Sequence, residues 1–116
     1  MYEILYYTDE DGNSPIEDYI ESLVAKTDKD SRIKANKILS YLDILAKHGI
    51  SAGEPYVKHL DGEIWELRPL RDRFLFAAWD GTKFILLHHF MKETRKTPTR
   101  EIKQAKRNLK GYRESN

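Results

Sequence analysis

Residues 64–91 constrain the fold more than any other part of the chain. Aromatic and aliphatic residues alternate with other types along this stretch, which is the period of a strand with one buried face. Asp80-Gly81 interrupts the stretch with a hairpin-turn signal, and Pro69 places the end of the preceding strand at an edge or bulge. The pattern predicts three consecutive strands, over residues 64–68, 73–79 and 83–91.

Two amphipathic helices are expected before these strands. Ser14-Pro15-Ile16-Glu17 is a helix start, with a capping serine, a proline at the first helical position and a glutamate that completes a capping box. A second helix is expected from about Thr27-Asp28 to His48-Gly49, where glycine fits a left-handed C-cap. Two such helices joined by a short link indicate an αα-hairpin. The inner stripe of the second helix is Ile38, Tyr41, Leu42 and Leu45, with Ile33 or Lys34 nearby.

The two ends of the chain complete the pattern. Residues 3–8 are rich in Ile, Leu and Tyr and are expected to form a first strand, and residues 57–60 a short extended segment. Thr97-Pro98 is expected to open a C-terminal helix, with Thr97 as its cap. Gly111 is expected to end that helix, before a frayed tail at residues 113–116.

The order β-α-α-(β)-β-β-β-α predicts one α+β domain over residues 1–116. It is expected to be a small, mainly antiparallel sheet with an N-terminal helical hairpin and a C-terminal helix packed on one side. Since the chain has no cysteine, disulfides, thiol nucleophiles and cysteine-ligated zinc are excluded. Without a membrane-length apolar run or a signal-peptide layout at the start, a cytoplasmic location is expected.

Charge is distributed unevenly along the chain. Residues 67–116 contain 13 Lys and Arg against 5 Asp and Glu, a balance of +8. Residues 1–66 contain 7 against 14, a balance of −7, so a formal net charge of +1 hides an acidic half and a basic half. A polarised surface of this kind attracts polyanions at one end, and nucleic acid is the first polyanion to consider.

Four cations from separate segments are expected to share one face of the sheet: Lys58, Arg68, Arg73 and Lys92. Such a cluster suits a phosphodiester, because arginine offers a bidentate fork and lysine a point charge. The same groups would stabilise the extra negative charge of a phosphoryl-transfer transition state. The alternative is that these are ordinary solvated charges. The wider cationic set adds Lys96, Arg100, Arg71 and Arg95.

Other side chains could assist catalysis or ligand binding beside this cationic cluster. No two histidines have the spacing of a helical metal motif, so neither a metal nor another cofactor is expected. His88 or His59 could serve as a general acid or base, or be a hydrogen-bonded structural histidine. Glu66 could hold Arg68 in place, or act as a base weakened by the low pKa that neighbouring cations impose. Phe74 or Phe90 could stack on a base, although strand aromatics are usually core.

The basic half of the chain also carries a combination of motifs. These are Ile64-Trp65-Glu66-Leu67-Arg68, Arg73-Phe74-Leu75-Phe76, residues 85–92, Lys96-Thr97-Pro98 and Glu101-Ile102. Together they resemble the RelE/HigB-type toxins of type II toxin–antitoxin systems, and in particular the phage-derived, HigB-like branch with the pattern L-h-x-F-x-K-x-x-x-K-T-P-x-x-E-I-x-x-A. The resemblance covers about residues 57 to 112 and is weaker in the N-terminal strand and helical hairpin.

The resemblance implies a RelE-like fold and a metal-independent, ribosome-dependent endoribonuclease that cuts messenger RNA and is blocked by a cognate antitoxin protein. It places the catalytic set on Arg68, Arg73, Lys58 and Lys92, with His88 a further candidate for proton transfer. Lys96, Arg95, Arg100 and Arg71 are the expected RNA-binding residues.

The chain departs from the family pattern at Glu93, where a second lysine is common, and Tyr112 is its only candidate for a C-terminal tyrosine acid. Two other interpretations stay open at this point. The basic face could belong to a non-catalytic nucleic-acid-binding or regulatory module, or the polarised charge could serve a protein partner alone. The first of these predicts salt-sensitive nucleic-acid binding without cleavage, and the second predicts no nucleic-acid affinity.

Overall fold

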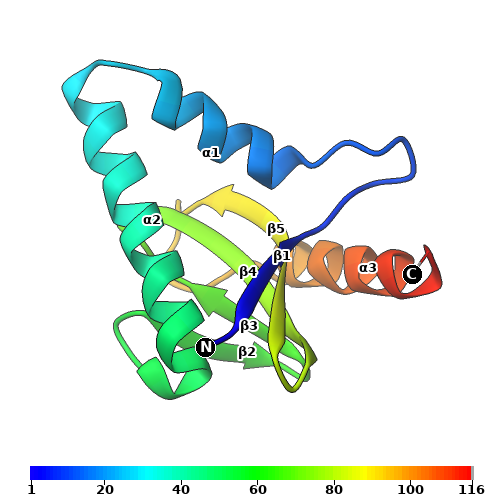
Figure 1. Cartoon of the computed structure of the whole chain (residues 1–116). Helices are drawn as coiled ribbons and strands as arrows, with labels where there is room; N and C mark the ends of the chain where they lie inside the picture. Colours follow the sequence, from blue (N-terminus) through cyan, green and yellow to red (C-terminus); the bar gives the residue numbers. More distant parts are fainter. Residues whose placement is uncertain (116) are drawn as a thin grey trace.

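A five-stranded sheet in the order β1-β5-β4-β3-β2 forms the centre of the computed structural model, which describes residues 1–115 (Figure 1). β1 runs parallel to β5, and the other neighbours are antiparallel. The predicted α+β class, with a mainly antiparallel sheet, a helical hairpin and a C-terminal helix, is confirmed. The elements are β1 (Glu3–Tyr6), α1 (Pro15–Ala25), α2 (Lys29–His48), the 3-10 helix η1 (Gly49–Ala52), β2 (Val57–Asp61), β3 (Ile64–Leu67), β4 (Asp72–Asp80), β5 (Lys83–Met91) and α3 (Thr99–Ser115).

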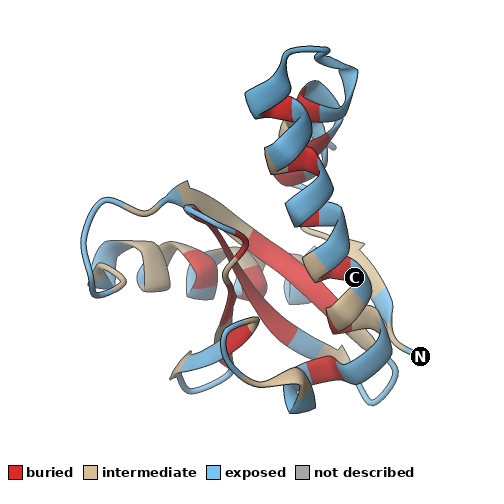
Figure 2. Cartoon of the chain, turned by 90° about the vertical axis from the view of Figure 1, so that its left-hand side faces the viewer, coloured by how far each residue is buried: buried red, intermediate tan, exposed pale blue. Residues whose placement is uncertain are grey.

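The helices cover both faces of the sheet, so the expectation that they pack on one side was wrong. α1 and α2 pack on the face that carries Phe74 and Phe76, while α3 packs on the opposite face against Leu75 and Leu87. The physical reason is that β4 buries consecutive residues, so both faces of the sheet expose apolar surface that must be covered. Figure 2 shows buried residues along the central strands and on the inner sides of the helices.

Several helix ends differ from the prediction. The Ser14 side chain makes no capping bond. α2 begins where it was expected to, and Asp28 caps it by accepting a hydrogen bond from the Ser31 amide at 3.0 Å. Thr97 does not cap α3, because its hydroxyl donates to the carboxylate of Glu66, which lies on β3.

The C-terminal helix also runs further than expected. α3 continues through Gly111 to Ser115, and its last turn contacts the rest of the fold: Tyr112 packs against Tyr7 and Trp79, and Arg113 forms an ion pair with Glu63 of the β2–β3 turn. The prediction of a frayed tail was therefore wrong for residues 113–115, which are helical, while Asn116 lies outside the described residues. The first strand ends at Tyr6 rather than at residue 8. Within residues 1–115, no helix combines the length and the apolar character needed to cross a membrane.

A buried carboxylate ties the helical hairpin to the sheet at the start of β4. The side chain of Asp72 is only 1% exposed, and its Oδ1 accepts hydrogen bonds from the Tyr19 hydroxyl at 2.6 Å and from His89 Nε2 at 2.7 Å. Lys34 Nζ lies 3.7 Å from Oδ2. Burial alone would raise the pKa of Asp72, but the two hydrogen bonds and the charge of Lys34 outweigh it and hold that pKa below its ordinary value.

This arrangement predicts a pH-dependent stability effect for Asp72→Asn. A carboxylate with a lowered folded-state pKa stabilises the fold above its unfolded pKa, near about 3.9, and loses that contribution as the pH falls through the folded value. We expect the variant to be less stable than the wild type by about 2 kcal/mol at neutral pH. The difference should shrink towards zero as the pH falls below the unfolded pKa and through the lowered folded-state pKa.

Urea unfolding at neutral pH and at several acidic pH values measures this difference, with Asp11→Asn at an exposed turn position as the matched control. A stability loss of the same size at every pH would contradict the role given to the charge of Asp72.

Candidate phosphate-binding cavity

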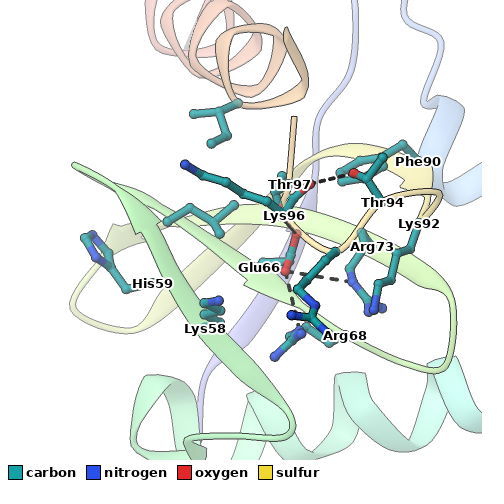
Figure 3. A pocket seen from close by; sticks show the side chains of 13 residues that line it. Lys58, His59, Glu66, Arg68, Arg73, Phe90, Lys92, Thr94, Lys96 and Thr97 are labelled. Carbon is teal, nitrogen blue, oxygen red and sulfur yellow. Dashed lines mark hydrogen bonds and ion pairs between the residues drawn. The ribbon is translucent and has the colours of Figure 1, made fainter. Parts of the chain in front are cut away.

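A cavity of about 160 Å³ opens on the α3 side of the sheet, where β2, β3, β4 and the segment after β5 meet (Figure 3). Its wall carries six cationic side chains from four different stretches of chain, together with one buried carboxylate, that of Glu66. Because of this cationic wall it is a candidate site for a phosphate group, and we call it the phosphate-binding cavity as a label for that hypothesis. The six cations are Lys58, Arg68, Arg73, Lys92, Arg95 and Lys96.

Strand register explains why these residues meet. Lys58 on β2 pairs with Glu66 on β3, and Glu66 pairs with Leu75 on β4, so the three lie in one row across the sheet. Arg68 and Arg73 are each two positions from a member of that row, so by alternation they share its face. The strand pattern therefore collects charges that are remote in sequence.

Glu66 is the centre of this arrangement, and its side chain is almost fully buried. Its Oε1 lies 3.5 Å from Arg68 Nε and 3.8 Å from Arg73 Nε. Its Oε2 accepts a hydrogen bond from the Thr97 hydroxyl at 2.5 Å. One carboxylate thus orients two guanidinium groups and fixes the segment that closes the cavity, as the dashed contacts in Figure 3 show.

Arg73 is the more rigid of the two arginines. Its side chain is 7% exposed, and its Nη1 donates to the carbonyls of Leu70 at 2.8 Å and Asp72 at 2.9 Å. Burial lowers the pKa of Arg73, Glu66 acts to raise it, and the charge of Arg68 lowers it further. Desolvated and held by backbone carbonyls, this cation is preorganised rather than free to follow a ligand.

Arg68 is the more accessible arginine, with 24% of its side chain exposed. Its Nη1 lies 3.2 Å from Glu54 Oε1, a contact between two side chains that solvent reaches. Its Nε is buried and lacks a hydrogen-bond partner within the described part of the chain. Arg68 therefore offers donors to a ligand in the cavity while Glu66 holds its orientation.

The segment 92–97 forms the outer wall of the cavity. The Thr94 hydroxyl donates to the Lys96 carbonyl at 2.7 Å, which bends the segment back over the cavity. The Lys92 amide donates to the Arg71 carbonyl at 2.8 Å, and the Arg71 guanidinium donates to the Lys92 carbonyl at 2.7 Å. Arg71 thus fixes the base of the segment instead of lining the cavity.

The structure gathers most, but not all, of the residues singled out from the sequence. Arg71 and Arg100 line other surface hollows. His88 also lies off the cavity wall, because its Nε2 is 2.9 Å from Glu101 Oε1 on α3. The histidine on the wall is His59, whose Nε2 lies 2.8 Å from the Gly62 carbonyl and therefore donates to it.

Two polar partners of the site could not be found from the sequence. Glu54 comes from the connector before β2 and reaches Arg68 only through the tertiary fold. Thr97 has the signature of a helix cap, and nothing local indicates that its hydroxyl bonds to Glu66. Within residues 1–115, no group of three or more His, Asp or Glu side chains is placed to hold a metal ion.

Comparison with known protein families identifies one that matches most of the chain. The model of the family described as "Phage derived protein Gp49-like (DUF891)" matches residues 24–110, about three quarters of the chain. No curated protein matches the chain. The matched range contains every side chain that lines the phosphate-binding cavity. The chain belongs to the phage-derived Gp49-like family.

Proposed function

We propose that this protein is the toxin of a type II toxin–antitoxin system and a ribosome-dependent messenger-RNA endoribonuclease of the RelE/HigB kind. The observation that supports it best is the convergence of Arg68 and Arg73, from different strands, on the buried carboxylate of Glu66. Two oriented guanidinium groups at the floor of a cationic cavity are the donors that a phosphodiester requires. The family match and the motifs around residues 64–102 agree with this assignment.

The proposed reaction is an internal transesterification of the RNA backbone. The 2′-hydroxyl oxygen attacks the adjacent phosphorus, the bond from phosphorus to the 5′-oxygen breaks, and the products are a 2′,3′-cyclic phosphate and a 5′-hydroxyl. One proton leaves the attacking oxygen and one is delivered to the departing oxygen, so no co-reactant is consumed. Arg68 and Arg73 bind the non-bridging oxygens and stabilise the charge that develops on them.

The rim side chains support this step. Lys58, Lys92 and Lys96 add positive field around the phosphate and donate to the RNA backbone. The general acid and the general base are two of the titratable side chains on the cavity wall. The candidates are these lysines, Glu66 and His59. Arg95 on the same wall contacts the backbone of the message.

His88 provides a discriminating prediction. It lies two residues before Phe90 of the cavity wall, but its side chain contacts Glu101 on α3 instead of the cavity. We expect His88→Gln to change the cleavage rate by less than about threefold, since glutamine can keep a hydrogen bond to Glu101. Single-turnover cleavage of ribosome-bound message measures this, and a His59→Gln variant provides the comparison on the cavity wall. A loss of 100-fold or more in His88→Gln, the range of a lost general acid or base, would return His88 to the site.

A second prediction concerns metal ions. Because the charge of the transition state is balanced by arginines and lysines, cleavage is expected to continue after zinc and manganese are removed. The chelator must leave the ribosome its magnesium, and mock-treated ribosomes are the control. Activity that disappears and returns on adding zinc or manganese alone would overturn the metal-independent assignment.

The proposed partner is an antitoxin protein with an acidic segment. A surface shaped for RNA is complementary to such a segment, and residues 67–116 carry the balance of +8 that would attract it. Hydrogen exchange with and without the partner should show protection in α3 or in residues 92–100. Protection confined to residues 14–48 would contradict this electrostatic argument.

Expression without the antitoxin tests the whole assignment. We expect growth arrest accompanied by cuts in translated messages. A folded protein that binds RNA in a salt-dependent manner, yet neither arrests growth nor cuts message, would instead be a non-catalytic binding module.

A further inference from the structure

A second hollow, of about 200 Å³, lies beside the phosphate-binding cavity. The two share the side chains of Phe90 and Thr94. Phe90 is partly exposed near the end of β5, and Figure 3 shows it beside Thr94 on the rim of the first cavity. A nucleotide whose phosphate occupies the first cavity has its base within reach of the second, because Phe90 and Thr94 line both.

The second hollow combines an apolar wall with a polar rim. Phe90, Met91 and Pro98 supply the apolar surface, and Glu93 and Arg100 stand on the rim. An aromatic ring next to flat apolar surface is the platform on which single-stranded bases stack. The rim charges are then placed to contact the edge of a stacked base.

Glu93 and Arg100 are both exposed, and neither side chain forms a hydrogen bond or ion pair with another residue among residues 1–115. Glu101, on the same hollow, is already engaged with His88 through Oε1. A free carboxylate this close to a phosphate site opposes phosphate binding through like-charge repulsion. Glu93 is therefore better suited to accept hydrogen bonds from a base than to contact the phosphate backbone of the RNA.

We propose that this hollow binds a guanine base of the nucleotide next to the cleaved phosphate, an inference that rests on the proposed function. Guanine presents two adjacent N–H donors, at N1 and N2, which match the two oxygens of a carboxylate such as Glu93. Its O6 and N7 acceptors match the fork of Arg100. Phe90 supplies the stacking surface, and uracil, with a single N–H donor, fits this pattern less well.

The test is the base profile of cleavage on ribosomes whose decoding-site codon carries each of the four bases in turn at each position. We expect the wild type to favour guanine at one position. Glu93→Gln should reduce the ratio of guanine to uracil cleavage about tenfold, because the amide replaces one acceptor by a donor. Phe90→Leu should slow cleavage of every message about tenfold through lost stacking. Glu21→Gln, an exposed charge change on α1, is the matched control and should leave the profile unchanged.

Binding of guanosine and uridine 3′,5′-bisphosphates, measured by calorimetry, separates this inference from the proposed function. Wild-type preference for the guanosine ligand, lost in Glu93→Gln and Arg100→Ala, supports the base site even if no message is cut. Cleavage with no preference for guanine, or a preference that Glu93→Gln leaves intact, overturns it. Equal binding of the two ligands by the wild type also overturns it.

Discussion

Replacing Arg68 with alanine is expected to slow cleavage of ribosome-bound message about 100- to 1000-fold, the cost of removing one donor that stabilises a transition-state charge. The loss should be mainly catalytic, because Arg68 is partly exposed and its contact with Glu54 joins two side chains at the surface. Single-turnover rates measure the effect, and circular dichroism with urea unfolding checks the fold. Arg68→Lys should recover only part of the rate, since lysine lacks the bidentate fork.

Arg32→Ala is the control for the loss of a positive charge, because Arg32 is exposed on α2 and lies away from the cavity. It should cleave at the wild-type rate. A folded Arg68→Ala variant with full activity would remove Arg68 from the proposed site. Arg73→Ala tests the same chemistry less cleanly, because Arg73 is buried and bonded to the carbonyls of Leu70 and Asp72, so the variant loses stability as well.

Glu66→Ala is expected to have the largest effect on stability, a loss of about 3 to 5 kcal/mol. The carboxylate is buried against Arg73, which is itself buried, so its removal leaves a desolvated cation without its partner. Cleavage should fall as well, because both guanidinium groups and Thr97 lose the atom that orients them. Glu66→Gln should fall between the wild type and alanine, since the amide still accepts from Thr97.

Glu63→Ala provides the matched control at the β2–β3 turn. Its carboxylate pairs with Arg113 on the surface, where an ion pair is worth about 1 kcal/mol or less. Chemical denaturation of both variants measures the contrast. If Glu66→Ala cost no more than Glu63→Ala, the buried carboxylate would not be the centre that holds the arginines.

Local patterns were sufficient to predict the central strands of the sheet and the gathering of their charges on one face. The Asp80-Gly81 turn formed as predicted, with the Asp80 carboxylate accepting hydrogen bonds from the Thr82 amide at 2.7 Å and the Thr82 hydroxyl at 2.8 Å. Strand alternation placed Arg68 and Glu66 on one face, because the side chains of a strand repeat every second residue. These features depend on neighbours in sequence, which is why a single sequence reveals them.

Features that depend on tertiary contacts were not predictable in the same way. Periodicity shows that a helix buries one face but does not say which side of the sheet receives it, so the position of α3 was missed. The register shift next to Leu75 leaves Leu87 unpaired and puts it on the same side of the sheet as His88. His88 then meets Glu101 on α3 instead of the cavity. A one-residue irregularity of this kind has no local signature in the sequence.

Mapping the ends of message cut by the purified protein on programmed ribosomes tests the central claim most directly. The account predicts a 2′,3′-cyclic phosphate and a 5′-hydroxyl at the cut within the decoding-site codon, with no cut in the same message without ribosomes and a 100- to 1000-fold slower cut by Arg68→Ala, as expected for one lost charge-stabilising donor. Message that the protein binds but leaves intact on the ribosome would contradict it, as would cut ends bearing a 5′-phosphate.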